Sequence, residues 1–257
     1  MYVSVNCAEQ RCFYDSRKGE RSAFAVGGET GNMSEIPYKT VIFDLDGTLL
    51  DTLQDLADAV NASLMQFGYP TRSIDEVRAF VGNGIRLLMI RALPGGDENP
   101  DFPAVFQAFR DYYARHCFDH TCPYPGIEQL LSALREKGCR TAVVSNKADT
   151  AVKALCSRFF PETIDIAIGE RESAGIRKKP APDTVFEVLR LLDAKKESAV
   201  YIGDSDVDIM TAVHAGLPCI SVTWGFRDKA FLAQNGATQY ASSPQELRKL
   251  LLPEMTI

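Results

Sequence analysis

The sequence predicts an α/β fold in which helices cover a parallel β-sheet, with an α-helical cap domain inserted near the start of the sheet. Short apolar segments rich in Val and Ile take turns with longer segments of helical spacing. Within these short segments apolar and polar residues do not alternate, which is typical of strands buried on both faces. The stretch from residue 51 to residue 122 interrupts the pattern because it contains no clear strand. Together these observations favour β-α-β units with a helical insertion.

The expected strands form a Rossmann-like sheet, because their alternation with helical patterns implies parallel strands covered by helices. The last of them is the weakest, because it has only three residues. The expected strands are Thr40–Leu45, Thr141–Ser145, Ile164–Ile168, Ala199–Ile202, Cys219–Val222 and Gln239–Ala241.

The helical patterns between the strands carry start and stop signals. Gly138 and Gly216 each follow such a pattern, and glycine is the common residue just past a helix end. Ser243 and Glu246 have the spacing of a capping box, which predicts a last helix. The other expected helices are Gly126–Lys137, Asp149–Phe160, Pro182–Leu192 and Asp206–Ala215.

The interrupting stretch has helical character throughout. Apolar residues from Leu53 to Phe67 follow helical spacing, Ser73 begins a second capping box, and Gly84–Leu93 and Ala104–Cys117 predict two further helices. Ligands of open α/β sheets bind outside the carboxyl ends of the strands, where a lid would lie. We therefore expect a core formed by residues 34–51 and 123–257, and a helical cap formed by residues 52–122.

Residues 1–33 differ from the rest of the chain. They show no sustained period and contain Gly27, Gly28 and Gly31. A binding tail, a disordered extension or a start codon assigned too far upstream would each explain this character. The expectation is a disordered extension.

The composition is that of an ordinary globular protein, with 257 residues, 46% hydrophobic and 24% charged. A net charge of −6 argues against nucleic acid or an anionic membrane as a partner, because either requires a basic face. No apolar stretch has the length of a membrane-spanning helix, and the first twenty residues lack the apolar run of a secretory signal. Seven scattered cysteines favour a reducing compartment. We expect a cytoplasmic protein, monomeric or homodimeric.

Two carboxylates follow the first expected strand. Asp44 and Asp46 are two residues apart, so both side chains point to the same side at the strand end. Carboxylates so close repel each other, which predicts a cation between or beside them. Gly47 permits a tight turn whose N–H groups can face an anion. A plain turn or helix cap is the alternative reading.

Three more segments place polar side chains at strand ends or helix starts. Asp204, Asp206 and Asp208 follow another apolar strand and extend the cation site, although Asp204 or Ser205 could instead cap a helix. Ser145, Asn146 and Lys147 follow a third strand and could hold a phosphate oxygen or form only a turn. Lys178 and Lys179 precede Pro180 and Pro182, and they could point a fixed charge into a site or lie in a solvated loop.

The four segments together, in this order, resemble the four motifs of the haloacid dehalogenase superfamily, from about Tyr38 to the C-terminus. The resemblance implies that Asp44 is the nucleophile that attacks phosphorus. Asp46 would be the general acid/base, and Thr48 would position it. Ser145 would bind the phosphoryl group, and Lys179 would pair with Asp44 and the phosphate.

The same resemblance implies that Mg²⁺ is bound by Asp44, the main-chain carbonyl of Asp46, and Asp204, with support from Asp208. Gly47, Thr48 and Asn146 would complete the phosphate site. Phosphoryl transfer depends mainly on charge neutralisation and placement, so this set of residue types is chemically adequate.

Several features narrow the choice within the superfamily. The aspartate two residues after the nucleophile is typical of its phosphatases and phosphomutases rather than its dehalogenases and ion pumps. The insertion after the first motif corresponds to the small-helical-cap branch. No lysine occurs between Lys39 and Lys137, which argues against phosphonate-cleaving and sugar-phosphomutase relatives.

The segment from Val81 to Arg86 resembles the specificity loop of phosphoglycolate phosphatases. Its glycines would allow close backbone approach to a ligand, and Arg86 could bind a substrate carboxylate. Asn83, Gly84 and Arg86 are therefore the candidate specificity residues, and a helix–helix turn with a solvated arginine is the alternative.

The run from His116 to Cys122 contains two histidines and two cysteines, but its spacing fits no standard zinc pattern. Its function stays open. The expected activity is Mg²⁺-dependent hydrolysis of a small phosphate monoester, with 2-phosphoglycolate favoured, through an aspartyl-phosphate. A pyrophosphatase or phosphosugar phosphatase is the alternative, and a phosphomutase or a silent binding protein fits less well.

Overall fold

A computed structural model describes residues 36–253 of the chain. The expected N-terminal extension, residues 1–33, lies outside the described residues. Within the described part, no helix combines the length and apolar character needed to cross a membrane.

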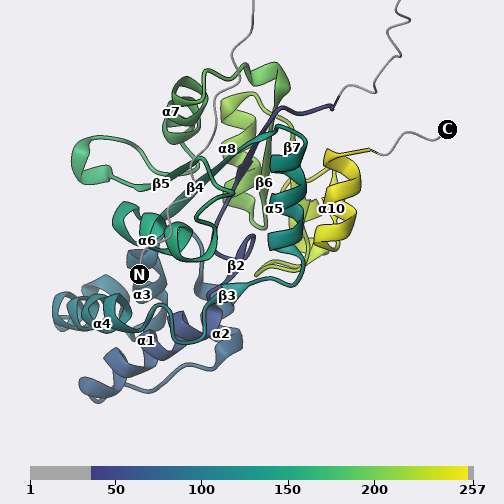
Figure 1. The fold of residues 1–257 in the computed structure, drawn as a ribbon. Coiled ribbons are helices and arrows are strands. Elements are labelled where there is room, and N and C mark those ends of the chain that lie inside the picture. Colours follow the sequence, from purple (N-terminus) through teal and green to yellow (C-terminus); the bar gives the residue numbers. More distant parts are fainter. Residues whose placement is uncertain (1–35, 254–257) are drawn as a thin grey trace, which may run out of the picture. The chain divides into compact units, whose positions relative to one another are not determined.

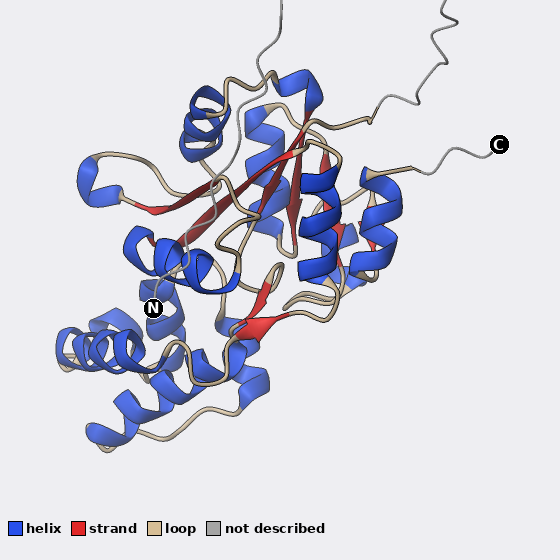
Figure 2. Ribbon diagram, viewed as in Figure 1, coloured by secondary structure: helices blue, strands red, loops and turns tan. Residues whose placement is uncertain are grey.

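A six-stranded sheet forms the centre of the core. Figures 1 and 2 show the sheet with helices on both sides. All five pairings between neighbouring strands are parallel, so the predicted α/β class with a parallel sheet is confirmed. In spatial order the strands are β5 (Ile166–Glu170), β4 (Arg140–Ala148), β1 (Thr40–Phe43), β6 (Ala199–Gly203), β7 (Cys219–Val222) and β8 (Tyr240–Ala241).

Both faces of the sheet are buried, which explains the strands' uniformly apolar sequences. Val41 and Phe43 pack into the hydrophobic cluster on one face, and Ile42 between them packs into the cluster on the other. All three side chains are fully buried. The absence of polar alternation was therefore a correct signal of double burial.

Helices supply the apolar side chains that cover these two faces. One face packs against α5 (Ile127–Glu136), α6 (Asp149–Phe159) and α10 (Pro244–Leu251). The other packs against α7 (Asp183–Leu191) and α8 (Asp206–Ala215). The remaining short elements of the core are α9 (Lys229–Gln234) and the 3₁₀ helices η2 (Glu172–Ala174) and η3 (Lys196–Ser198).

Helix ends follow the expected signals with one correction. Gly216 ends α8 in the left-handed conformation, with φ 68°, which only glycine adopts without strain. At the start of α10 the Ser243 side chain accepts from the N–H of Glu246, as a capping box requires. The Glu246 carboxylate, however, accepts from the N–H of Ser242, one residue before the cap. The predicted reciprocal box is therefore only half formed.

The insertion between β1 and α5 is helical, as expected. Its residues form a hydrophobic cluster of their own, in which Leu64, Met89 and Phe109 are fully buried. The Ser73–Glu76 capping box is present at the start of its second helix. Its elements are α1 (Leu53–Gln66), α2 (Ile74–Phe80), α3 (Ile85–Ala92), the 3₁₀ helix η1 (Gly96–Glu98) and α4 (Phe102–His116).

A two-stranded antiparallel ribbon joins the two ends of this insertion, and the sequence did not predict it. β2 (Leu50–Asp51) pairs with β3 (Cys122–Pro123). Strands of two residues are too short to show a period, and a proline in one of them removes the usual signal. All described residues belong to one compact unit, so the division at residues 52 and 122 stays a prediction.

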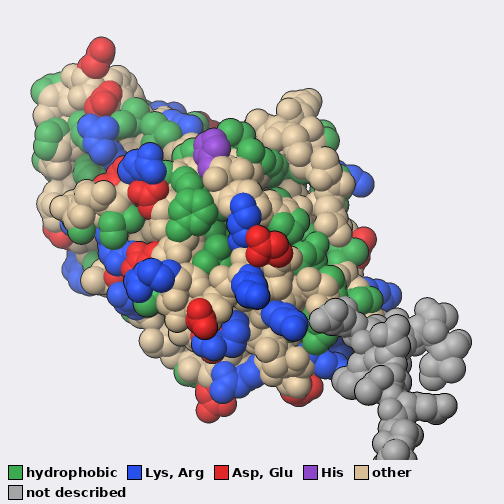
Figure 3. Space-filling view, turned by 90° about the horizontal axis from the view of Figure 1, so that it is seen from above, with side chains coloured by type: hydrophobic (Ala, Val, Ile, Leu, Met, Phe, Trp, Pro, Cys, Tyr) green, Lys and Arg blue, Asp and Glu red, His purple; other side chains and the backbone are tan. Residues whose placement is uncertain are grey.

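The surface carries mixed charge. On the face that Figure 3 shows, Lys and Arg side chains lie among Asp and Glu side chains. The expectation that nucleic acid is not a partner is untested by this arrangement and stays a prediction.

Candidate active site

The carboxyl edge of the sheet brings three predicted motifs together. Asp44 directly follows β1, Asp204 directly follows β6, and Ser145 lies in β4. Because β1 pairs with both β4 and β6 in register, the three residues lie side by side at one edge. The strand β4 runs three residues beyond its predicted end, so Ser145 lies inside the strand rather than at its end.

Lys179, from the loop before α7, completes this group. Its ammonium lies 2.8 Å from Asp44 Oδ1, 2.8 Å from Asp208 Oδ1 and 3.2 Å from the Tyr201 hydroxyl. Burial opposes the lysine charge, but Asp208 and Asp44 hold the pKa of Lys179 well above its usual value. The alternative of a solvated loop is therefore wrong for Lys179, which lies in a loop but is only 3% exposed.

Three buried carboxylates surround the site of a possible cation. Oxygen atoms of Asp44, Asp204 and Asp208 all lie within 4.8 Å of one another. Burial, reinforced by Asp208, raises the pKa of Asp44 to about 7, although Lys179 opposes the shift. Burial and the same carboxylates raise the pKa of Asp204 well above its usual value. A single lysine cannot balance three carboxylates, and hard oxygen ligands of this kind suit a divalent cation.

Asp204 is held by backbone and hydroxyl donors. Its Oδ2 accepts from the Phe226 N–H at 2.7 Å, and its Oδ1 accepts from the Thr48 hydroxyl at 3.3 Å. The backbones of Gly47 and Gly225 approach it so closely that a side chain at either position would collide with its carboxylate. Thr48 was expected to position Asp46, and the structure corrects this, because its hydroxyl is bonded to Asp204.

Asp208 combines two roles that the sequence left as alternatives. Ser205, rather than Asp204, is the N-cap of α8, and Asp208 completes its capping box. Its Oδ2 accepts from the Ser205 hydroxyl at 2.6 Å, while its Oδ1 faces Lys179. The helix cap thus orients a carboxylate of the site.

Asp46 has a cationic partner of its own, which sequence reasoning did not assign. The Lys147 ammonium lies 2.7 Å from Asp46 Oδ1 and 4.8 Å from the ring centroid of Tyr113 on α4. Asp46 and Lys147 both line the cavity at the strand edge. The position of Lys147 two residues after Ser145 was a signal in the sequence that it could belong to the site. The direction of its side chain, however, depends on the extension of β4, which the sequence did not predict.

The two polar residues before Lys147 differ in what they can do. Ser145 lines the cavity, and its oxygen accepts from the Lys147 N–H, so its proton is available to a ligand. The side-chain amide of Asn146 exchanges two hydrogen bonds with the backbone of Lys179, at 2.8 and 3.0 Å. Asn146 therefore fixes the lysine loop, and its expected direct contact with phosphate is untested.

The cap side of the cavity is formed by the predicted specificity loop. Gly82, Asn83 and Gly84 all have positive φ, from 63° to 121°, and all three line the cavity. Arg86 does not line it. Its side chain is 58% exposed, lies 3.6 Å from Asp97 and contacts the Phe102 ring. The structure thus supports the solvated-arginine alternative for Arg86.

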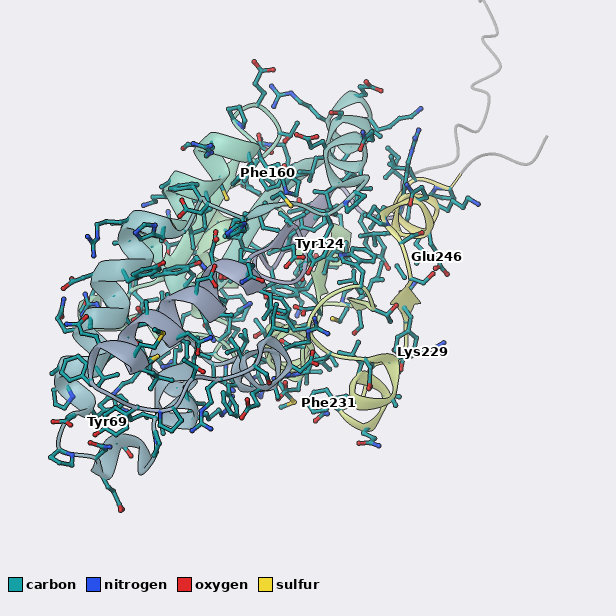
Figure 4. The ribbon with its side chains drawn as sticks, turned by 90° about the horizontal axis from the view of Figure 1, so that it is seen from below. Tyr69, Tyr124, Phe160, Lys229, Phe231 and Glu246 are labelled. Atoms are coloured by element: carbon teal, nitrogen blue, oxygen red, sulfur yellow. The ribbon has the colours of Figure 1, made fainter. Side chains whose placement is uncertain are left out.

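An arginine from the core, Arg227, reaches the cap instead. Its guanidinium donates to the carbonyls of Arg78, Ala79 and Val81 at the end of α2, at 2.6 to 3.3 Å. It also lies 5.3 Å from the Phe231 ring, which Figure 4 shows on α9 near Lys229. Sequence reasoning had left this segment unassigned.

The contacts that the structure describes for the run from His116 to Cys122 indicate a structural role. The Asp55 carboxylate accepts from the N–H groups of His120 and Thr121 and from the Thr121 hydroxyl, at 2.7 to 2.9 Å. These bonds tie α1 to the end of the insertion. His120 also lies 3.8 Å from Asp58. The two oxygens of Asp55 are already engaged by the N–H groups of His120 and Thr121.

The cavity lies between the edge of the sheet and the helical insertion. Its floor is the strand edge with Asp44, Asp204 and Lys179, and its opposite wall is the loop from Val81 to Ile85. This arrangement can hold a small anionic ligand against a nucleophilic carboxylate, a lysine and a cation.

Comparisons with known proteins agree with this geometry. The profile of the haloacid dehalogenase-like hydrolase family matches residues 41–222. The chain is 32% identical over 227 residues to a phosphoglycolate phosphatase of Pseudomonas syringae pv. tomato, covering 83% of this chain and 78% of that protein. It is 36% identical over 190 residues to one of Rhodobacter capsulatus, covering 73% and 85%.

Solved structures show the same fold. A Lactobacillus delbrueckii protein, provisionally described as a phosphoglycolate phosphatase, is 37% identical with a TM-score of 0.81, covering 85% of this chain and all of that one. CbbY from Rhodobacter sphaeroides, solved in complex with phosphate, is 27% identical with a TM-score of 0.67, covering 82% and 96%.

The parallel sheet, its acidic edge and the similarity to these relatives together identify a phosphatase that hydrolyses phosphoric monoesters. The chain belongs to the haloacid dehalogenase-like hydrolase family, as the order of its motifs implied.

Proposed function

We propose that this enzyme hydrolyses 2-phosphoglycolate, with Mg²⁺ as cofactor and an aspartyl-phosphate on Asp44 as intermediate. The observation that carries the proposal is the buried cluster in which Lys179 contacts both Asp44 and Asp208 beside Asp204. The named relatives supply the favoured substrate. The cytoplasmic location and the monomeric or homodimeric state remain predictions.

The cation would be held by Asp44 and Asp204, with Asp208 behind them and the carbonyl of Asp46 as the expected fourth ligand. When bound, Mg²⁺ would neutralise the carboxylates and the phosphate oxygens, so that one anion can approach another. The residues fit this group because three carboxylates there face a single lysine.

In the first step, a carboxylate oxygen of Asp44 attacks phosphorus, and the bond from phosphorus to the glycolate oxygen breaks. Asp46 gives its proton to that oxygen, so glycolate leaves with a neutral hydroxyl. Ser145 donates its free hydroxyl proton to a phosphoryl oxygen, and Lys179 neutralises charge on the same group.

In the second step, water attacks phosphorus and Asp46 accepts the water's proton. The bond between phosphorus and Asp44 breaks, which releases phosphate and restores the carboxylate. One difficult hydrolysis is thus replaced by two easier displacements, the first by Asp44 and the second by water.

Cap chemistry distinguishes this proposal from phosphate transfer within a sugar. Among the described residues that line the cavity, the cap contributes apolar side chains, an asparagine and glycines, but neither lysine nor histidine. Hydrolysis therefore fits the cavity better than a mutase reaction.

The test is a panel of phosphate monoesters, including 2-phosphoglycolate and phosphosugars, together with the anhydride pyrophosphate, assayed for phosphate release by the purified full-length protein. We expect 2-phosphoglycolate to give the highest kcat/KM. Activity should vanish in EDTA and return with Mg²⁺. A clear preference for pyrophosphate or a phosphosugar would replace the substrate, and full activity without a divalent metal would remove the cofactor.

A further inference from the structure

The cavity contains few cations that could bind the end of a substrate opposite its phosphate. Among the described residues, its basic lining side chains are Lys147, Lys179 and Arg227. Lys179 is enclosed by Asp44 and Asp208 on the phosphate side. The terminal nitrogens of Arg227 donate to carbonyls at the end of α2. Lys147 is the remaining candidate.

Lys147 lies at the junction of core and cap. Its side chain is 4% exposed, its ammonium contacts Asp46, and the ring of Tyr113 from the cap lies beneath it. The Tyr113 hydroxyl is buried and has no hydrogen-bond partner in the described part of the chain. An ammonium has three N–H donors, and Asp46 uses one of them. The ammonium therefore keeps donors for a ligand in the cavity that it lines, whereas Tyr113 does not line that cavity.

In a small phosphate ester that carries a carboxylate, the residue that binds the carboxylate must lie next to the general acid. In 2-phosphoglycolate a single methylene separates the leaving oxygen from the carboxylate carbon. The group that protonates the leaving oxygen is Asp46, so the carboxylate must lie beside Asp46. Lys147 is bonded to Asp46, whereas Arg86 lies outside the cavity.

We propose that Lys147 binds the anionic end of the substrate and so determines its specificity. This inference rests on the proposed function and deepens it. The lysine then serves two groups at once: it orients Asp46 and pairs with the substrate carboxylate. The specificity determinant thus comes from the second core motif, and the cap supplies the Tyr113 ring that packs against the lysine.

A matched pair of substrates separates recognition from the positioning of Asp46. The pair is 2-phosphoglycolate and its carboxamide, which differ in charge but hardly in size. Loss of Asp46 orientation slows both, whereas loss of a carboxylate contact slows only the acid. The ratio of their kcat/KM values therefore isolates the contact.

We expect Lys147→Met to lower this ratio by roughly 10- to 100-fold, the usual range for a hydrogen bond to a charged group. Lys147→Gln keeps a polar end without the charge and should also lower the ratio, so it tests the site even if Lys147→Met folds poorly. Lys153→Met, a lysine exposed on α6, is the matched control and should leave the ratio unchanged.

The outcomes divide clearly between the two proposals. If wild type prefers the acid and both variants keep that preference, the Lys147 proposal is wrong and the proposed function stands. If Arg86→Met or Arg227→Lys removes the preference instead, the reader is misassigned.

A wild type that favours another anionic monoester rejects the substrate, and the same ratio with that ester's neutral analogue then tests Lys147. If wild type hydrolyses no monoester, calorimetric binding of phosphonoacetate and methylphosphonate replaces the assay. Equal affinity for the two ligands in wild type would overturn the inference.

Discussion

The two walls of the cavity are built differently. On the core side, carboxylates and lysines are nearly fully buried and fixed by partners from neighbouring strands, as with Asp204 and Lys179. On the cap side, the wall consists of backbone at Gly82 to Gly84 and of apolar side chains. The core therefore holds the chemistry, while the cap mainly sets shape. Even the links between them, Lys147 and Arg227, originate in the core.

The strongest test of this contrast removes the nucleophile. Asp44→Asn is isosteric, so we expect kcat to fall on the order of 10⁴-fold or more while the protein stays folded. Because burial already disfavours the charge of Asp44, the thermal midpoint of the metal-free variant should not decrease. Phosphate release and thermal unfolding measure the two effects. Substantial turnover in a clean preparation would contradict the assignment of Asp44.

The charge imbalance of the core wall predicts a dependence of stability on pH. Burial raises the pKa of Asp44 to about 7, so between about pH 4 and pH 7 the folded state binds more protons than the unfolded state. The free energy of unfolding of the metal-free protein should therefore decrease as pH rises through this window. Asp204, whose pKa is also raised, acts in the same direction.

Mg²⁺ should reverse this loss, because it binds the deprotonated carboxylates. We expect the rise in thermal midpoint caused by Mg²⁺ to be larger at pH 8 than at pH 5. Scanning calorimetry in EDTA and in Mg²⁺ measures it, with Ca²⁺ as a second oxygen-seeking ion. Equal Mg²⁺ effects at both pH values would argue against a carboxylate site.

The link between the walls can be weakened without touching the chemistry of the core. Arg227→Lys keeps the charge but loses the planar guanidinium fork that spans three carbonyls, so the loop from Val81 should be less well placed. We expect kcat/KM to fall roughly 2- to 10-fold, equally for carboxylated and neutral esters, since these bonds are partly exposed. A selective loss for one ester would show that Arg227 contacts the substrate.

The smallest effect is expected for Arg86→Ala. Arg86 is largely exposed, and its 3.6 Å ion pair with Asp97 is worth at most about 1 kcal/mol in the free energy of unfolding. The kcat/KM for 2-phosphoglycolate should stay within about twofold of wild type. A tenfold loss confined to carboxylated substrates would restore the sequence-based expectation and show that the loop turns on binding.

The sequence predicted the core wall well because its signals are local. A strand followed at once by Asp44 and Asp46, or by Asp204, fixes position along the chain and at the sheet edge together. Side-chain direction was harder. Arg86 and Lys147 each lie in a segment that the sequence singled out, but Arg86 at the start of α3 is exposed, whereas Lys147 in the extended strand β4 lines the cavity.

Other misses have similar causes. The short helix α9 has only six residues and gave no period to detect. The Thr48 hydroxyl donates to Asp204 rather than to Asp46, and the close approach of Gly47 and Gly225 to Asp204 is a contact that the local sequence does not reveal. Such choices depend on contacts between segments more than 150 residues apart, as the separation of 156 between Thr48 and Asp204 shows.

Two adjacent residues of the loop after β7 touch both walls at once. The N–H of Phe226 holds Asp204, and the guanidinium of Arg227 holds the end of α2. A displacement of the cap would therefore be transmitted to a metal-binding carboxylate through a single peptide unit. Thermodynamic linkage requires such coupling to be reciprocal, so a substrate that draws the cap inward should tighten the hold on the cation by the same factor that the cation tightens the hold on substrate.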